Sequence, residues 1–209
     1  KYLFYGTNLE SITVTDDFSV WSQIGPLSIG NGGELFACIP TYEGKVTIPA
    51  SVTSILDAFV GCSRITEIEC EDYTKTMSVG ISKYRGSFEG CTSLASIALP
   101  NVILMDNYTF KDCSSLETVS ITTIDRIGDM MFSGTSLVNL SLDYSKTGYV
   151  GTRAFENMKI KSFDASGMEI GAYAFKGCLD LQTFTTNENT ILNTGALSGS
   201  GIQSLTLYL

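Results

Sequence analysis

The chain has 209 residues, a formal net charge of −9 and no histidine. This acidity argues against a nucleic-acid binder, which needs a basic surface to displace counterions from phosphates. It also argues against attraction to an anionic membrane surface. Without histidine, catalytic triads and metal sites that depend on imidazole are excluded. An apolar fraction of 44% with 17% charged residues indicates a folded chain, and no apolar run is long enough to span a bilayer.

A short pattern recurs along the sequence. It consists of an aromatic residue, a Cys three positions later, a Leu three positions after that, and then two alternating apolar positions. Clear copies lie at Phe88–Leu99, Phe110–Ile121 and Phe175–Thr186. Self-similarity at a fixed period is the signature of a solenoid, and the later intervals of 20 to 23 residues fall in the leucine-rich-repeat range. Nine units are predicted, with these residues at the aromatic position: Phe4, Phe36, Phe59, Phe88, Phe110, Phe132, Phe155, Phe175 and Leu197.

The first unit is incomplete. Its sequence from Phe4 aligns without gaps on the sequence from Phe132, so the chain starts in mid-unit, truncated at residue 1. We therefore expect a further N-terminal segment, such as a signal peptide, in the natural protein. An insertion near 16–34 contains the only tryptophan, Trp21, and several glycines. It predicts a longer excursion with a hairpin, in which Trp21 covers the apolar edge of the first unit.

A second insertion, near 71–87, is interpreted as a solvated loop, and insertions in solenoids are often on the binding side.

Each unit contributes one short strand, because apolar and polar residues alternate at the end of the repeat pattern. Ile97 and Leu99 are expected to point inward, and Ser96 and Ala98 outward. One unit cannot bury its own apolar face, so the units must stack. A Gly before the aromatic residue fits a tight corner, for which a single helical or 3₁₀ turn is expected.

These patterns predict one domain over residues 1–209, a mainly β, right-handed leucine-rich-repeat solenoid with a parallel sheet and short helical or 3₁₀ corners. The cysteines support this interpretation. Cys62, Cys91, Cys113 and Cys178 all follow the aromatic residue by three positions, and Thr135 takes that place in another unit. A position shared by Cys and Thr is typical of core packing, so free buried thiols are favoured over disulfides and over a metal site.

The best copy, Ile170–Cys178 continuing to Leu181 and Phe184, resembles the BspA-like class of leucine-rich repeats, with the prolines of its pattern supplied by Pro49 and Pro100. The resemblance covers most of the chain from Thr47 onward, together with the incomplete unit at Phe4. It implies a bacterial surface or secreted protein of a family associated with attachment to host matrix proteins or other cells. It carries no catalytic residues, and the chain departs from the family pattern at Phe36 and in both insertions.

The outward strand positions are rich in hydroxyl groups and include an acidic stripe. They fit either a solvated sheet face or a shallow face that binds a protein or a glycan. The scarcity of aromatic residues there weakens the binding interpretation. Lys45 is expected opposite Glu67 on the neighbouring strand. The candidate binding residues are Glu67, Glu69, Glu71, Ser96, Thr118, Ser120, Asn139, Ser141, Asp143, Asp164, Thr183 and Thr185.

Calcium is disfavoured at the acidic stripe, because alternate carboxylates on one strand lie about 6.6–7 Å apart. No cofactor and no metal are expected. The predicted function is a non-enzymatic binding or adhesion module at the bacterial cell surface, with a host or neighbouring-cell protein or glycan as partner. The alternatives are a structural spacer that projects another domain and, more weakly, a glycan-active β-helix enzyme. The apolar last strand, Ile202–Leu209, also predicts weak end-to-end self-association.

Overall fold

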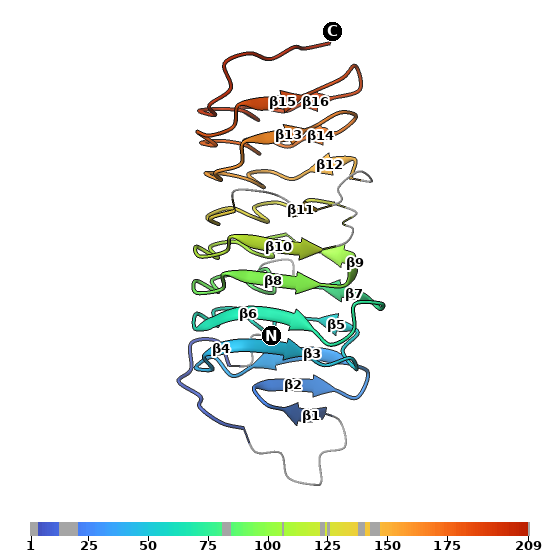
Figure 1. Ribbon diagram of the computed structural model, residues 1–209, viewed down its shortest axis with the longest axis vertical. Helices are drawn as coiled ribbons and strands as arrows, with labels where there is room; N and C mark the ends of the chain where they lie inside the picture. The colour runs from blue at the N-terminus through green and yellow to red at the C-terminus, as the bar shows by residue number, and fades with distance from the viewer. Residues whose placement is uncertain are drawn as a thin grey trace.

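The computed structural model describes residues 4–12, 21–80, 85–105, 107–121, 124, 126–137, 141–142 and 147–208. The chain winds into an elongated stack of coils, with the N-terminal part at one end and the C-terminus at the other (Figure 1). Every regular element among these residues is a strand. The structure is therefore a mainly β solenoid built from parallel sheets, as the repeats predict.

One side of the stack carries the strands that the repeat pattern predicts, and we call it the front sheet (Figure 1). Its members are β4 (Gly44–Ile48), β6 (Ile65–Cys70), β8 (Ser96–Leu99), β10 (Thr118–Ile121) and β11 (Ser141–Leu142), followed by β13 (Ser162–Asp164) and β15 (Thr183–Thr185). Its strands pair in parallel in two groups, one in the order β11-β10-β8-β6-β4 and the other made of β13 and β15. Each coil thus supplies one strand at the same place.

A second row of strands forms where each coil turns back, and we call it the second sheet. It contains β3 (Glu34–Cys38), β5 (Ser54–Ile55), β7 (Thr76–Val79) and β9 (Asn101–Met105), with β12 (Tyr149–Val150), β14 (Glu169–Ile170) and β16 (Ile191–Leu192) further along. These strands also pair in parallel. At its N-terminal end, β1 (Trp21–Ile24) and β2 (Leu27–Gly30) add two antiparallel strands beside β3. This hairpin lies in the first insertion, where the sequence predicts one.

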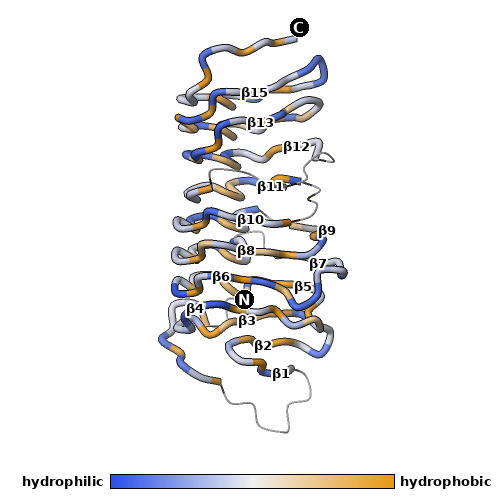
Figure 2. The backbone as a smooth tube through the Cα atoms, viewed as in Figure 1, coloured by the Kyte–Doolittle hydropathy of each residue, from blue (hydrophilic) through white to orange (hydrophobic). Residues whose placement is uncertain are grey.

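A column of phenylalanine rings fills the interior. Phe59, Phe88, Phe110, Phe132, Phe155 and Phe175 are each fully buried. Successive rings lie 5.2, 5.4, 5.6, 5.6 and 4.9 Å apart between centroids, and each pair is stacked. Offset-stacked rings at this separation add to the hydrophobic stabilisation. The continuous column confirms the central prediction of the repeat pattern, and Figure 2 shows hydrophobic positions recurring in coil after coil.

In the corner around each phenylalanine, successive backbone N–H groups donate alternately within the same coil and to the next coil. In the coil of Phe155, the N–H groups of Ala154, Glu156 and Met158 donate to carbonyls three residues earlier. The intervening N–H groups of Arg153, Phe155 and Asn157 donate instead to the next coil. The i→i+3 bonds are those of a 3₁₀ turn, but only every second residue makes one. The expected helical corner is therefore a chain of turns and not a continuous helix.

This alternation requires left-handed backbone at two places in a corner. Arg153 and Asn157 have φ angles of 54° and 64°, and Tyr173 and Gly177 repeat them with 57° and 72°. Glycine reaches this region without steric cost, whereas other residues pay for it. The corner is consequently a place where several non-glycine residues hold a disfavoured conformation.

Side chains also tie one corner to the next. Asn107 Oδ1 accepts a hydrogen bond from the Asp129 N–H at 2.9 Å, and Asp129 Oδ1 accepts one from the Thr152 N–H at 2.8 Å. Ion pairs do the same nearby, since Lys176 Nζ lies 3.0 Å from Glu156 Oε1. Burial disfavours the ionised form of Glu156, but hydrogen bonds from Lys176 and Arg153 outweigh it and lower the pKa of this carboxyl.

The second unit differs from its prediction. Phe36 lies within β3 and not at the corner. The corner position belongs to Cys38, because its N–H donates to the Ala58 carbonyl just as the Phe59 N–H donates to the Ser87 carbonyl one coil later. Gly33, at a φ of 86°, takes part in the turn into β3. The glycine-rich insertion therefore shifts the register of this unit by two residues.

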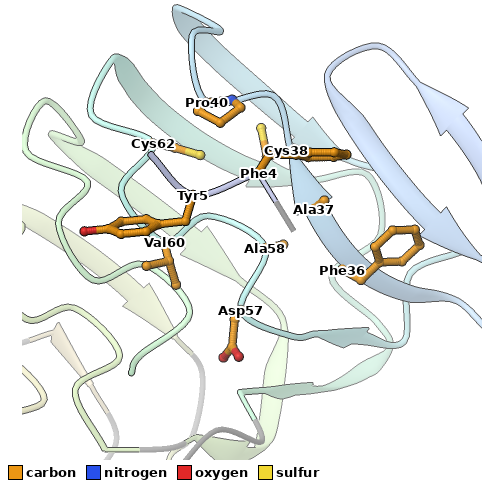
Figure 3. Close-up of a pocket in the computed structure, with 10 residues that line it drawn as sticks. All are labelled: Phe4, Tyr5, Phe36, Ala37, Cys38, Pro40, Asp57, Ala58, Val60 and Cys62. Carbon is orange, nitrogen blue, oxygen red and sulfur yellow. The ribbon is translucent and has the colours of Figure 1, made fainter. Parts of the chain in front are cut away.

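The segment 4–12 packs beside these first coils. Thr7 donates to the Phe4 carbonyl through its N–H at 3.1 Å and its Oγ1 at 2.7 Å, as Thr135 does to Phe132, which supports the predicted alignment of the two units. Phe4 and Tyr5 lie near Cys38 and Cys62 and line a cavity of about 10 Å³ with them (Figure 3). Such a volume holds about one water molecule. The side chain of Trp21 is outside the described part, so its covering role stays a prediction.

The cysteines are free and buried, as predicted. Cys91, Cys113 and Cys178 donate their thiols to the carbonyls of Phe59, Phe88 and Phe155 in the preceding coil, at 3.1, 3.0 and 3.0 Å. Thr135 uses its hydroxyl on the carbonyl of its own coil instead. This position therefore requires a small side chain that can donate one hydrogen bond inside the core. Both Cys and Thr meet this requirement, which explains why Thr can replace Cys there.

Candidate binding face

The outward side chains of the front sheet form ladders across neighbouring strands. Lys45 pairs with Glu67, Glu67 with Ser96, and Ser96 with Thr118. Ser120 pairs with Ala98 on one side and with Ser141 on the other. Further along, Asp164 pairs with Thr185, and Ser162 with Thr183. The strands thus bring most of the predicted residues together on one face.

At one end of this face, a lysine joins the acidic stripe. Lys45 Nζ lies 3.1 Å from Glu67 Oε1 and 2.7 Å from Glu69 Oε2, which confirms the predicted pairing across the strands. The Thr47 hydroxyl donates to Glu69 Oε1 at 3.2 Å. The hydrogen bond from Lys45 is the main reason why the pKa of Glu69 is lowered, and that of Lys45 is raised chiefly by Glu69. Lys45 and Glu69 therefore both carry their charge at neutral pH.

Two of the predicted carboxylates are used by the fold itself. Glu71 lies just after β6, and its Oε2 accepts a hydrogen bond from the Ala50 N–H at 2.8 Å. Asp164 Oδ1 accepts one from the Ser166 N–H at 3.0 Å, which closes a local turn. Both side chains hold backbone groups in place, so they are less free to meet a ligand than Glu67.

Among the described residues, the candidate hydroxyl side chains of the front sheet hold no backbone group in this way. Thr118, Ser120, Thr183 and Thr185 are exposed and Ser96 is half-buried. Ser141 belongs to β11, of which only the backbone is described, and Asn139 and Asp143 lie outside the described residues. The described face is consequently flat, with short hydroxyl side chains over its middle.

A groove interrupts the face at its C-terminal end. It has a volume of about 260 Å³ and lies between β15 and the segment 202–208, lined by Gln182, Thr183, Phe184, Thr185, Thr186, Ser204, Thr206 and Tyr208. The Thr186 hydroxyl donates a hydrogen bond to the Thr206 carbonyl at 2.6 Å, which joins the two walls of the groove. Tyr208 is 54% exposed and supplies an aromatic ring to a face that otherwise has few. Residues 202–208 form no strand, although the sequence predicts one over Ile202–Leu209, so the place of Tyr208 in this groove could not be predicted from strand alternation.

The described residues contain no group of three or more acidic or Cys side chains that could hold a metal ion. Within the same part of the chain, no helix has the length and hydropathy needed to cross a membrane. The described part of the face offers hydroxyl groups, carboxylates and the exposed ring of Tyr208. Chemically, this arrangement can donate and accept hydrogen bonds over a broad surface.

Two solved structures share the fold. A leucine rich cell surface protein from Faecalibacterium prausnitzii matches with a TM-score of 0.62 and 22% sequence identity, over 83% of this chain and 47% of that one. A leucine rich repeat protein from T. pallidum matches with a TM-score of 0.60 and 20% identity, over 79% of this chain and 80% of that one. The chain thus spans less than half of the first relative.

No curated protein matches the chain. The family model of the BspA type leucine rich repeat region matches residues 34–161, 80–182 and 105–208, with six copies of the repeat. These matches cover the phenylalanine column and the front sheet, and they confirm the resemblance that the repeat pattern indicates. The chain belongs to the family of BspA type leucine-rich repeat proteins.

Proposed function

We propose that this chain is a non-enzymatic binding module of a bacterial cell surface, and that its front face recognises a protein or glycan partner. The observation that carries the proposal is the groove at the C-terminal end of the face. There, exposed hydroxyl groups of Thr183 and Thr185 meet the exposed ring of Tyr208. Tyrosine is enriched where binding energy concentrates, because it combines a large apolar area with a hydrogen-bonding tip.

The surrounding face supports the same proposal. Its hydroxyl side chains are short and exposed, so a partner can approach the sheet closely over several coils. Solenoid sheets commonly serve as extended binding surfaces. The description of the F. prausnitzii relative as a cell surface protein supports the proposed location.

A structural spacer is the second candidate. The continuous phenylalanine column gives the stack a single connected core, and this favours a stiff rod that could project another domain. A spacer needs no particular chemistry on its faces. The two candidates therefore differ in how substitutions on the front face should act.

The experiment compares two exposed threonines on parallel strands. Thr183→Arg in β15 places a long charged side chain in the groove, whereas Thr76→Arg in β7 places the same side chain on the second sheet. Both variants and the Tyr208→Ala variant are assayed for adhesion to immobilised matrix proteins and to a glycan array. A binding face predicts at least about a tenfold loss of signal for Thr183→Arg and Tyr208→Ala, and none for Thr76→Arg.

Equal adhesion by all three variants would refute the binding face and favour the spacer. Circular dichroism and the unfolding midpoint serve as folding controls. Both substituted threonines are exposed, so each midpoint should stay close to that of the unsubstituted chain.

A further inference from the structure

A second depression lies at the N-terminal end, where four segments that are distant in sequence meet. It has a volume of about 480 Å³, and its lining includes Glu10, Pro26, Ile39, Thr41, Tyr42 and Arg64. Pockets for small ligands typically range over about 300–1,000 Å³ and combine apolar walls with a few polar groups. This depression has both properties.

Hydrogen bonds fix the walls before any ligand arrives. The Ile39 N–H donates to the Pro26 carbonyl at 2.9 Å, which attaches the hairpin turn to the loop between β3 and β4. The Thr41 hydroxyl donates to the Leu9 carbonyl at 2.6 Å. The Tyr42 hydroxyl donates to the Lys45 carbonyl at 3.1 Å, which holds the tyrosine ring in place. A pre-organised wall lowers the ordering cost of binding.

The chemistry of the lining is asymmetric. Pro26, Ile39 and the ring of Tyr42 offer apolar surface. The guanidinium of Arg64 is exposed and makes no hydrogen bond or ion pair within the described part of the chain, whereas the Arg64 carbonyl accepts a hydrogen bond from the Gly44 N–H at 3.2 Å. By contrast, Lys45 and Lys176 are held in ion pairs. An unused guanidinium beside an apolar wall can grip a carboxylate with two parallel hydrogen bonds.

We propose that this pocket binds the C-terminal residue of a partner polypeptide, with its carboxylate on Arg64 and an apolar side chain against Pro26, Ile39 and Tyr42. Glu10 lies on the same lining and repels the carboxylate, so it tunes the affinity downward. The site belongs to the insertion side of the chain and extends the proposed binding function, but it does not require the front face to bind.

The test uses acetyl-Gly-Gly-Leu with a free C-terminal carboxylate and the same peptide as its C-terminal amide, titrated into the full chain and followed calorimetrically. The free acid should bind at least about tenfold more tightly than the amide, because a hydrogen bond to a charged group is worth that much. Arg64→Ala should abolish this difference. Arg64→Lys should keep only part of it, since lysine lacks the planar fork. Glu10→Gln should tighten binding of the free acid.

Two controls make the test specific. Arg126→Ala removes another exposed arginine and should leave peptide binding unchanged. The Nη2 of Arg126 donates a hydrogen bond to Asn107 Oδ1 at 3.2 Å on a different corner. Thr183→Arg on the front face should also leave it unchanged, so the two binding proposals can fail separately. Equal binding of acid and amide, an Arg64→Ala variant that binds like the unsubstituted chain, or no binding of the acid at about 1 mM would each overturn the inference.

Discussion

Removal of one ring from the phenylalanine column should cost this protein a large part of its stability. Phe110 is fully buried, and its ring lies 5.4 Å from that of Phe88 and 5.6 Å from that of Phe132. Phe110→Ala loses the transfer free energy of the ring and leaves a cavity between two coils, which together cost about 3–5 kcal/mol. The free energy of unfolding of natural domains is about 5–15 kcal/mol. With mid-range values for both quantities, this one substitution removes a third or more of the stability.

Equilibrium unfolding in urea, followed by circular dichroism, measures this loss. The slope of the transition should be unchanged, because both states keep the same surface exposure apart from one side chain. Leu179→Ala is the matched control, since Leu179 is 76% exposed and its loss should cost no more than about 0.5 kcal/mol. A cost below about 1 kcal/mol for Phe110→Ala would refute the idea that the column holds the coils together.

Four further predictions concern the corners and the thiols. Asp129→Ala leaves the Thr152 N–H without its partner and should lower the free energy of unfolding by about 1–3 kcal/mol, whereas Asp129→Asn, which keeps the oxygen, should cost less in the same urea titration. Glu156 has a lowered pKa, so its stabilisation is present above the unfolded glutamate pKa of about 4.3 and is lost as pH falls through the folded value. The difference in unfolding midpoint between Glu156→Gln and the unsubstituted chain should accordingly be large at neutral pH and vanish in acid. Asn157→Gly should raise the thermal midpoint, with a gain of about 0.5 kcal/mol, because glycine adopts the left-handed angle freely; a lower midpoint would contradict this. All six cysteines are buried, and burial raises the pKa of the Cys178 thiol to about 12. Because the reagent cannot reach buried thiols, the cysteines should react with Ellman's reagent only after unfolding, and any rapid reaction of the native protein would disagree.

Much of the fold could be predicted because it depends on contacts that repeat with the sequence. From Phe88 to Phe175 a phenylalanine recurs every 20 to 23 residues, which places these rings in one column, since similar lengths of chain return to equivalent places. Lys45 could be placed opposite Glu67 for the same reason, because a one-residue slip would turn Ile68 out of the core.

Other features could not be predicted, because they depend on local backbone geometry or on segments that meet only in space. Cys38 and not Phe36 takes the second corner, owing to glycine-rich turns that shift the chain by two residues. The left-handed φ angle of Arg153 could not be predicted from the sequence, because arginine usually avoids this backbone region. The lining of the Arg64 pocket comes from the N-terminal segment, the hairpin, a loop and a turn, which no periodicity relates.

The alternating bonds at the corners have an evolutionary consequence. Each corner donates its N–H groups to a row of carbonyls in its successor, and its own carbonyls accept the same row of hydrogen bonds from the preceding corner. A gene rearrangement that adds or deletes one whole coil therefore creates a junction indistinguishable from the existing ones. Copy number can change in a single step, and the stack then becomes longer while the pattern of backbone bonds at its corners stays the same.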